Sequence, residues 1–248
     1  MKEIIKKIKS KKTLDRLDDT FVESFLNIFL KKNSKLNKKY LDGELKKKDI
    51  RIIVKSVRNN LNRFYGQFWT SDKLKLESHR STKERLGIYD KLYSFIFSIT
   101  CRPKTILDLA CGLNPLTYKN IGNDIYFIAV ELTEYDCGKI KEYFERENIK
   151  GEVIRADLRT YNTFPSADLC FMFKILDSLG GNNNLIAENL IRSVKAKYIV
   201  ASFSTKNVKG KKMNYPKRGW FEIMLRRIGY RFVKFDTNNE VFYIIKKL

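Results

Sequence analysis

Apolar residues recur at intervals of three and four along the first quarter of the chain, which is the spacing of one helix face. The clearest stripe runs over residues 50–68, and a shorter one runs over residues 21–29. The sequence therefore predicts that most of residues 1–72 are helical.

Three features predict where helices begin. Thr20–Glu23 and Ser81–Glu84 have the Ser/Thr-x-x-Glu pattern of a capping box. Asp49 stands just before the longer apolar stripe and is a candidate cap for that helix. Because apolar residues continue at helical spacing over residues 86–96, we expect the helix that starts near Ser81 to run through them.

After residue 104 the pattern changes to short β-like runs that alternate with helical stretches. The helical stretches are expected near residues 133–147, 185–194 and 215–228. The predicted strands are, in chain order, Thr105–Leu109, Ile125–Val130, Gly151–Arg155, Ala167–Phe173, Tyr198–Phe203, Arg231–Phe235 and Val241–Ile245. This alternation is typical of an α/β fold with a doubly wound parallel sheet.

The last two predicted strands are joined only by residues 236–240, a hairpin-like connection that leaves the final strand antiparallel. Seven strands with an antiparallel last strand, preceded by a helical module, indicate a Rossmann-like class I methyltransferase sheet. We expect the boundary between the helical module and the α/β domain near residue 75, giving units 1–75 and 76–248.

The chain is strongly basic, with 50 Lys and Arg against 28 Asp and Glu and a formal net charge of +22. Such an imbalance costs self-repulsion and suits a polyanionic partner. Lysines are dense between the first helices, where Lys38, Lys39 and Lys47 are candidate RNA contacts. A merely solvated surface, a lysine-rich proteome or adaptation to heat are the alternative interpretations.

Cysteine and histidine usage narrows the chemistry. The four cysteines form no C-x-x-C pair, so neither a zinc site nor a disulfide framework is expected. The single histidine, His79, excludes H-E-x-x-H metal sites and limits Ser-His or Cys-His catalysis to that one residue. We expect no metal, no secretory signal and no membrane span, and therefore a cytoplasmic protein.

Acidic residues and a glycine stand where predicted strands end. Asp108 lies near the end of the first strand and Gly112 follows that strand, while Glu131 follows the second strand and Asp157 the third. Ligands of such sheets bind at the carboxyl ends of the strands, and an acid at the second can accept hydrogen bonds from ribose hydroxyls. Each acid is also compatible with a helix cap or a loop position, but together the four residues predict one adenosine site.

Several segments resemble the aminoglycoside-resistance 16S rRNA (guanine-N7) methyltransferases. The sharpest are the run Ala110–Leu116, A-C-G-L-N-P-L, and the segment His79–Arg85, H-R-S-T-K-E-R. Residues 171–176 and the tail 202–222 also resemble this family, and the first 60 residues do so only loosely. The sequence departs from the family at Asp177 and Ser204, where relatives usually have proline.

The resemblance implies S-adenosyl-L-methionine as cofactor, bound by residues that line one pocket. Arg85 would pair with the methionine carboxylate, Glu131 would hold the ribose, and Asp157 would read the adenine. Phe68, or else Tyr65, would close the pocket from the helical module. The full set of implied cofactor residues is His79, Arg80, Ser81, Arg85, Asp108, Ala110, Gly112, Glu131, Asp157, Leu158, Phe173, Asn182 and Phe68.

The fourth predicted strand bears on the methyl acceptor. It lacks the N-P-P-Y or D-P-P-Y segment of exocyclic-amine methyltransferases, and Cys170 inside it is expected to be buried rather than nucleophilic. A ring nitrogen such as guanine N7 needs only alignment of its lone pair with the methyl group. Lys174, where the family also has lysine, is the candidate residue for positioning the target, with a structural role as the alternative.

The segment after the fifth predicted strand is basic and contains glycine, which suits a phosphate backbone. Its candidate RNA contacts are Lys206, Lys209, Lys211 and Lys212. Its candidate stacking residues are Phe203, Tyr215 and Trp220, with a place in the core as the favoured alternative for Trp220. The predicted function is an RNA methyltransferase, a monomer acting on 16S rRNA in the 30S subunit or on tRNA. A non-catalytic RNA-binding assembly factor and a small-molecule methyltransferase are the other classes.

Overall fold

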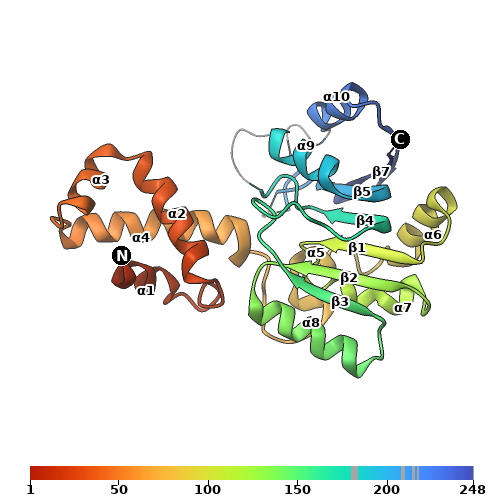
Figure 1. Cartoon of the computed structure of the whole chain (residues 1–248), viewed down its shortest axis with the longest axis horizontal. Coiled ribbons are helices and arrows are strands. Elements are labelled where there is room, and N and C mark those ends of the chain that lie inside the picture. The colour runs from red at the N-terminus through yellow and green to blue at the C-terminus, as the bar shows by residue number, and fades with distance from the viewer. Residues whose placement is uncertain (180–183, 208–209, 214–215, 217, 248) are drawn as a thin grey trace. The chain divides into compact units, whose positions relative to one another are not determined.

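The computed structural model describes residues 1–179, 184–207, 210–213, 216 and 218–247 (Figure 1). The chain forms two compact units, Met1–Thr70 and Ser71–Leu248. The division falls a few residues before the boundary expected from the sequence, because the apolar stripe of the last N-terminal helix ends there.

The N-terminal unit consists of four helices and a π-helical turn around a small apolar core. Ile53, Val57 and Leu61 lie on the inner face of the longest helix and are not exposed, as their spacing predicts. The elements are α1 (Lys2–Lys9), α2 (Asp19–Lys31), α3 (Ser34–Leu41), α4 (Lys47–Leu61) and η1 (Asn62–Gly66).

The predicted helix starts are wrong in detail. Helix α2 begins at Asp19 with Asp18 in the cap position, so Thr20 lies inside the first turn. Asp49 stands in the first turn of α4, where its carboxylate accepts a hydrogen bond from the Lys46 backbone N–H at 3.1 Å. A carboxylate can stabilise the N-terminus of a helix from the third helical position as well as from the cap position. The presence of an acidic residue therefore does not determine at which residue the helix begins.

The helix expected to run from Ser81 through residue 96 is also wrong, because it is interrupted. Helix α5 (Arg80–Lys83) is a single turn with His79 in the cap position, and α6 (Tyr89–Thr100) begins after five intervening residues. The Thr82 hydroxyl bonds back to the carbonyls of Leu76 and His79, and the intervening turn carries Arg85 into the interior. Long-range contacts of this turn override the local helical pattern.

The second unit is built on one seven-stranded sheet in the order β3-β2-β1-β4-β5-β7-β6. Strand β7 lies between β5 and β6 and is antiparallel to both, which confirms the predicted final strand. The strands are β1 (Thr105–Leu109), β2 (Tyr126–Glu131), β3 (Gly151–Arg155), β4 (Ala167–Phe173), β5 (Ala196–Ser204), β6 (Arg231–Asp236) and β7 (Glu240–Lys246).

Helices cover both faces of this sheet (Figure 1). Alternate strand residues face opposite layers, so that Ile106 packs with α6, α7 and α8, whereas Leu107 packs with α9 and α10. The remaining helices are α7 (Tyr118–Ile121), α8 (Glu134–Arg146), α9 (Asn184–Ser193), α10 (Gly219–Arg227) and the short 3-10 turns η2 (Leu76–Ser78) and η3 (Asn114–Thr117).

The topology brings several segments to one edge of the sheet. Strands β1, β2, β4 and β5 are parallel, so their carboxyl ends share that edge. Because β7 runs the other way, its first residue, Glu240, lies opposite Ser204 at the end of β5. Within the described ranges, no helix is both long and apolar enough to cross a membrane.

Candidate active site at the carboxyl edge of the sheet

The turn after β1 contains two residues in the left-handed backbone region. Ala110 and Gly112 both have positive φ, 51° and 53°, in the left-handed region that favours glycine. A Cβ on Gly112 would lie 2.7 Å from the His79 ring. The glycine therefore lets His79, which precedes α5, pack directly on the turn. The spacing of the motif did not predict this contact.

Asp108, near the end of β1, is 1% exposed. One carboxylate oxygen accepts a hydrogen bond from the Asn114 side-chain amide at 2.7 Å. The other oxygen has no hydrogen-bond partner among the described residues. Burial raises the pKa of Asp108 to about 7, against the opposing effects of Asn114 and Arg85. A buried oxygen of this kind is a natural acceptor for a polar ligand.

Glu131 closes the same turn from the end of β2. Its two oxygens accept hydrogen bonds from the backbone N–H groups of Gly112 at 2.8 Å and Leu132 at 2.9 Å. Burial, followed by the nearby Asp136, raises the pKa of Glu131 to about 7. Each carboxylate oxygen retains a second lone pair, so the group can accept two further hydrogen bonds.

Asp157 follows β3 and is held by a neighbour. The Arg159 guanidinium bonds both of its oxygens at 2.5–3.0 Å, and the Arg159 backbone N–H donates to it at 3.0 Å. Leu158 between them is 8% exposed. An adenine edge read by Asp157 would therefore meet a carboxylate that Arg159 already orients.

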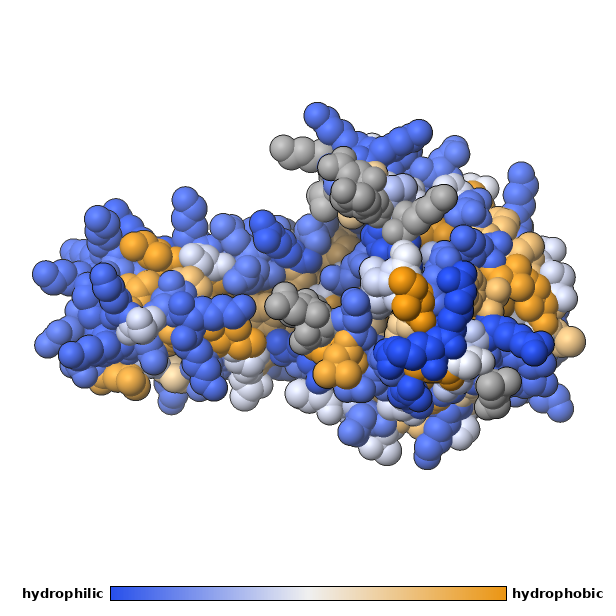
Figure 2. All heavy atoms as spheres, turned by 90° about the horizontal axis from the view of Figure 1, so that it is seen from above, coloured by the Kyte–Doolittle hydropathy of each residue, from blue (hydrophilic) through white to orange (hydrophobic). Residues whose placement is uncertain are grey.

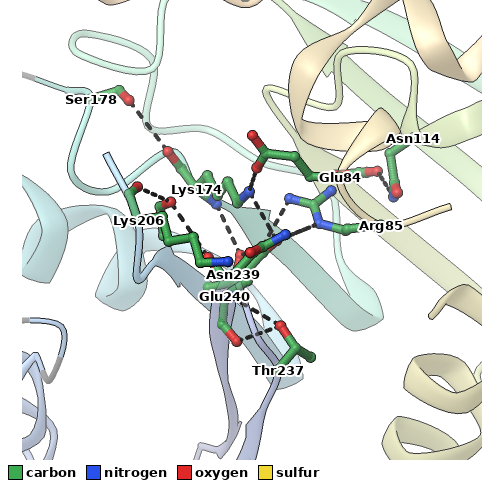
Figure 3. A network of polar contacts seen from close by, with 12 residues as sticks. Glu84, Arg85, Asn114, Lys174, Ser178, Lys206, Thr237, Asn239 and Glu240 are labelled. Atoms are coloured by element: carbon green, nitrogen blue, oxygen red, sulfur yellow. Dashed lines mark hydrogen bonds and ion pairs between the residues drawn. The ribbon is translucent and has the colours of Figure 1, made fainter. Parts of the chain in front are cut away.

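A network of buried charges lies beside β4 and β5 (Figure 3). Arg85 donates to Glu240 through Nε and one terminal nitrogen at 3.0–3.1 Å, and its guanidinium lies 4.6 Å from the Phe173 ring centroid. Lys174 Nζ pairs with Glu240 at 3.1 Å and with Glu84 at 2.5 Å. Burial would raise the pKa of Glu240, but the two cations hold that pKa below its ordinary value.

His79 is not a general base of ordinary strength. Burial, and then the positive charges of Arg85 and Lys174, lower the pKa of His79 to about 3. Its imidazole is therefore neutral near pH 7 and packs against the Gly112 turn.

The structure brings together most, but not all, of the predicted cofactor residues. Those that surround the strand edge as described above are His79, Arg85, Asp108, Ala110, Gly112, Glu131, Asp157, Leu158 and Phe173. Arg80 and Ser81 form the first turn of α5, next to His79. Phe68 and Tyr65 belong to the N-terminal unit, so their closure of the pocket stays a prediction, and Asn182 lies outside the described residues.

The predicted RNA-contacting loop is partly described. Lys206 and Lys212 face each other in an antiparallel bridge, and Gly210, with φ of 78°, makes the turn between them. Lys211 and Lys212 are exposed. Lys209 lies outside the described residues, as does the predicted stacking residue Tyr215.

The prediction that Phe203 stacks on an RNA base is wrong. Phe203 is 0% exposed and packs edge-on against Phe221, Tyr243 and Trp220, with ring centroids 4.8–5.9 Å apart. It follows the pleat of β5 into the core, where a base has no access. The expectation that Cys170 is buried is confirmed, with 0% exposure.

Sequence reasoning missed Glu240 and Arg218. The latter is 6% exposed and pairs with Asp177 at 2.7 Å while donating to the Ser204 carbonyl at 3.1 Å. It thus joins the two positions at which the sequence departs from the resembled family. No local motif marks either residue, because their partners lie far away in the sequence.

Comparison with known proteins identifies a family to which this chain is similar. Residues 70–244 match the family described as "Ribosomal RNA methyltransferase (FmrO)". A 16S rRNA (guanine(1405)-N(7))-methyltransferase from Serratia marcescens is 32% identical over 213 residues, 78% of this chain and 83% of that protein. A protein of the same name from Micromonospora rosea is 28% identical over 182 residues, 71% of this chain and 66% of that one.

The fold has a solved counterpart along its whole length. The structure of the 16S rRNA methyltransferase RmtF in complex with S-adenosyl-L-homocysteine has a TM-score of 0.78 and 19% identity, and the match covers 100% of this chain and 98% of that one. The family match extends over well more than half of the sequence and includes the strand-edge turn, Glu131 and Asp157. The chain therefore belongs to the FmrO family of ribosomal RNA methyltransferases.

Proposed function

We propose that this chain is an S-adenosyl-L-methionine-dependent enzyme that methylates N7 of a guanine in 16S rRNA. The named activity of its relatives supports the reaction and the substrate. The observation that carries the proposal is the convergence of Asp108, Gly112 and Glu131 in one turn at the carboxyl edge of the sheet.

The residues at this edge fit the cofactor. Glu131 presents two acceptor oxygens fixed by backbone amides, as a ribose diol requires. The left-handed turn at Gly112 packs against His79, and Asp108 supplies a buried acceptor oxygen. When bound, the cofactor would supply a methyl group on a positively charged sulfur, a charge that the ionised forms of Asp108 and Glu131 would favour.

The site has the chemistry expected for a neutral acceptor nitrogen. His79, with its lowered pKa, is a poor proton acceptor near pH 7, and Lys174 Nζ is paired with Glu84 and Glu240. An N7 lone pair attacks without losing a proton, so what the chain contributes is position and desolvation. Lys174 would then act by holding the loop after β4 against the target rather than as a base.

The N-terminal unit supplies a candidate surface for the rRNA backbone. Figure 2 shows hydrophilic side chains over most of its visible surface, at the left, with small apolar patches between them. A groove of about 700 Å³ runs between α1 and α4, lined by Lys7, Ser10, Lys11, Lys47, Ile50, Arg51, Val54, Lys55, Arg58 and Asn59. We define this set as the α1–α4 groove.

The cations of the groove are arranged to meet phosphates. Lys47, Arg51 and Lys55 are spaced by four, so they share one exposed face of α4. They make no ion pair with any described residue. In contrast, the predicted contact Lys39 is 3.1 Å from Asp49, while Lys38 is exposed. We therefore assign the larger part of the electrostatic attraction to the α4 face.

Two measurements test the proposed reaction. Transfer of labelled methyl groups to 30S subunits, naked 16S rRNA and tRNA, followed by cleavage specific for N7-methylguanine, should label 30S subunits or 16S rRNA at guanine and leave tRNA unlabelled. Labelling of tRNA alone would contradict the substrate, and absence of S-adenosyl-L-homocysteine binding in calorimetry would contradict the enzyme.

A charge-matched pair of variants tests the RNA surface. Replacing Lys47, Arg51 and Lys55 by Gln should lower 30S affinity and reduce the slope of log affinity against log salt by about three, one per lost phosphate contact. The control replaces Lys31, Lys32 and Lys35, three exposed cations of the same unit, by Gln. Equal losses in both variants would mean that net charge, and not the groove, attracts the RNA.

A further inference from the structure

Glu240 is a buried carboxylate that no sequence motif marks. It is the first residue of β7 and is 1% exposed. Thr237 fixes its backbone, since the Thr237 hydroxyl accepts from the Glu240 N–H at 3.0 Å and donates to the Glu240 carbonyl at 2.8 Å. The carboxylate is thus delivered to the strand edge from the far end of the chain.

Three elements of the site converge on this carboxylate (Figure 3). Arg85 reaches it from the turn after α5, Lys174 from the end of β4, and the Ser202 hydroxyl from β5. The side chains of Arg85 and Lys174 are 2% and 8% exposed. Two cations this deeply buried need a compensating anion, and Glu240 pairs with both of them.

Glu240 and Phe173 together define how Arg85 is oriented. The Phe173 ring lies against the guanidinium plane, and Glu240 takes the edge formed by Nε and one terminal nitrogen. This takes two of the five N–H groups of the arginine, and the Tyr89 hydroxyl also lies beside the guanidinium. Arg85 also lies close enough to Asp108 and His79 to lower the pKa of both groups, which places it beside the Gly112 turn.

We propose that Glu240 is a positioning residue for the amino-acid end of the cofactor. It holds Arg85 so that the remaining N–H groups meet the methionine carboxylate, and it anchors Lys174 at the target side of the same site. This inference rests on the proposed function, because it assigns Arg85 to that carboxylate. It goes further by making the C-terminal hairpin, through Glu240, part of the cofactor site.

The test compares two ligands that differ only in the part Arg85 would meet. S-Adenosyl-L-homocysteine carries the amino-acid carboxylate, whereas 5′-methylthioadenosine has the same nucleoside and thioether without it. In Glu240→Gln the shape is kept but the negative charge is lost, so Arg85 loses its charge-assisted bonds. We expect S-adenosyl-L-homocysteine to bind roughly 10–100-fold more weakly by calorimetry, and 5′-methylthioadenosine to bind within about twofold of wild type.

Other outcomes overturn the assignment. Equal weakening of both ligands would make Glu240 a structural residue only, and an unchanged or tighter affinity for S-adenosyl-L-homocysteine would mean that it does not position Arg85 or that it competes for it. Glu222→Gln is the matched control: Glu222 is another ion-paired glutamate, bonded to Lys234 and Tyr243, and this variant should keep both affinities.

Two milder variants keep the test valid if Glu240→Gln does not fold. Ser202→Ala removes one hydrogen bond to the carboxylate and should weaken S-adenosyl-L-homocysteine binding by a smaller factor, again without affecting 5′-methylthioadenosine. Glu240→Asp keeps the charge and should recover part of the lost selectivity. Failure of wild type to bind either ligand would refute the proposed function itself, whereas intact wild-type binding with unselective variants refutes only the role of Glu240.

Discussion

Glu131 and Glu240 are both almost fully buried glutamates at the same edge of one sheet, 8% and 1% exposed, yet their surroundings act on them in opposite ways. Glu131 receives two neutral backbone amides, and its pKa is raised to about 7. Glu240 receives Arg85 and Lys174, and its pKa is lowered. Burial is common to both, so the charge of the partners decides the outcome.

The difference separates two tasks within one site. A carboxylate held by neutral amides keeps lone pairs for the hydroxyl groups of a ligand. A carboxylate held by buried cations is committed to compensating their positive charge and orienting them. The β1–β2 half of the edge is thus arranged to accept hydrogen bonds, and the β4–β5–β7 half to orient positive charges.

The largest expected difference between the two halves of the sheet edge is in how much each glutamate contributes to folding stability. Glu240→Ala leaves two buried cations without their shared anion and should lower the free energy of unfolding by about 3–5 kcal/mol. Glu131→Ala leaves only neutral amides unpaired and should cost about 1–3 kcal/mol. Urea denaturation followed by Trp220 fluorescence, in a Trp69→Phe background, would report the catalytic unit. Equal losses of unfolding free energy in the two variants would show that the charge of the partners does not distinguish Glu240 from Glu131.

The raised pKa of Glu131 predicts that folding stability depends on pH, with an effect somewhat smaller than that of Glu240→Ala. Because its folded pKa of about 7 exceeds its ordinary value of 4.5, the folded state holds an extra proton between these values. Its contribution to stability is complete below about pH 4.5 and is lost as the pH rises through about 7. The amide side chain of the variant Glu131→Gln has no proton to lose in this range. The stability of this variant relative to wild type should therefore increase by roughly 1–3 kcal/mol from about pH 5 to pH 8.

The control for this pH measurement is Glu222→Gln. Burial would raise the pKa of Glu222, but Lys234 and Tyr243 lower it below its ordinary value of 4.5, so the stability that its ionisation contributes is present above that value. The difference in stability between this variant and wild type should stay constant over the same range. A constant difference for Glu131→Gln as well would show that Glu131 titrates normally.

A backbone change next to Glu131 should have a comparable or smaller effect. Gly112→Ala adds a Cβ 2.7 Å from the His79 ring at a φ of 53°, and we expect a loss of about 1–3 kcal/mol. Gly43→Ala has the same kind of φ, 74°, but meets nothing within 4 Å, so it measures the backbone strain alone. Thermal unfolding of both variants would test this, and equal losses would exclude a steric role for His79.

The smallest expected effect is at a second ion pair of the β4–β5 half. Asp177, whose side chain is 41% exposed, pairs with Arg218, which also donates to the carbonyls of Ser204 and Pro216. Because solvent screens the pair and Arg218 keeps other acceptors, Asp177→Ala should cost about 1 kcal/mol or less. A loss as large as that of Glu240→Ala, measured by the same denaturation, would mean that exposure is not what distinguishes these pairs.

Part of this site was predictable because it is encoded locally. The alternation of residues 105–109 and 151–155 placed two strands with their observed bounds, and strand ends then identified Asp108, Glu131 and Asp157. Parallel strands bring their carboxyl ends to one edge whatever the loops do, so the convergence of these acids follows from topology alone. The glycine of the turn was marked by its place directly after a strand.

The partners of these groups were decided only by the tertiary structure. Arg85 and Glu240 are 155 residues apart in sequence, and they meet because β7 inserts between β5 and β6. The same long-range contact interrupts the helix that local spacing predicted after Ser81, and the pleat of β5 turns Phe203 away from the site. Sequence periodicity determines which face of its own element a residue occupies. The ionisation of a buried charged group instead depends on its partners, and these come from whichever distant segment packs beside it.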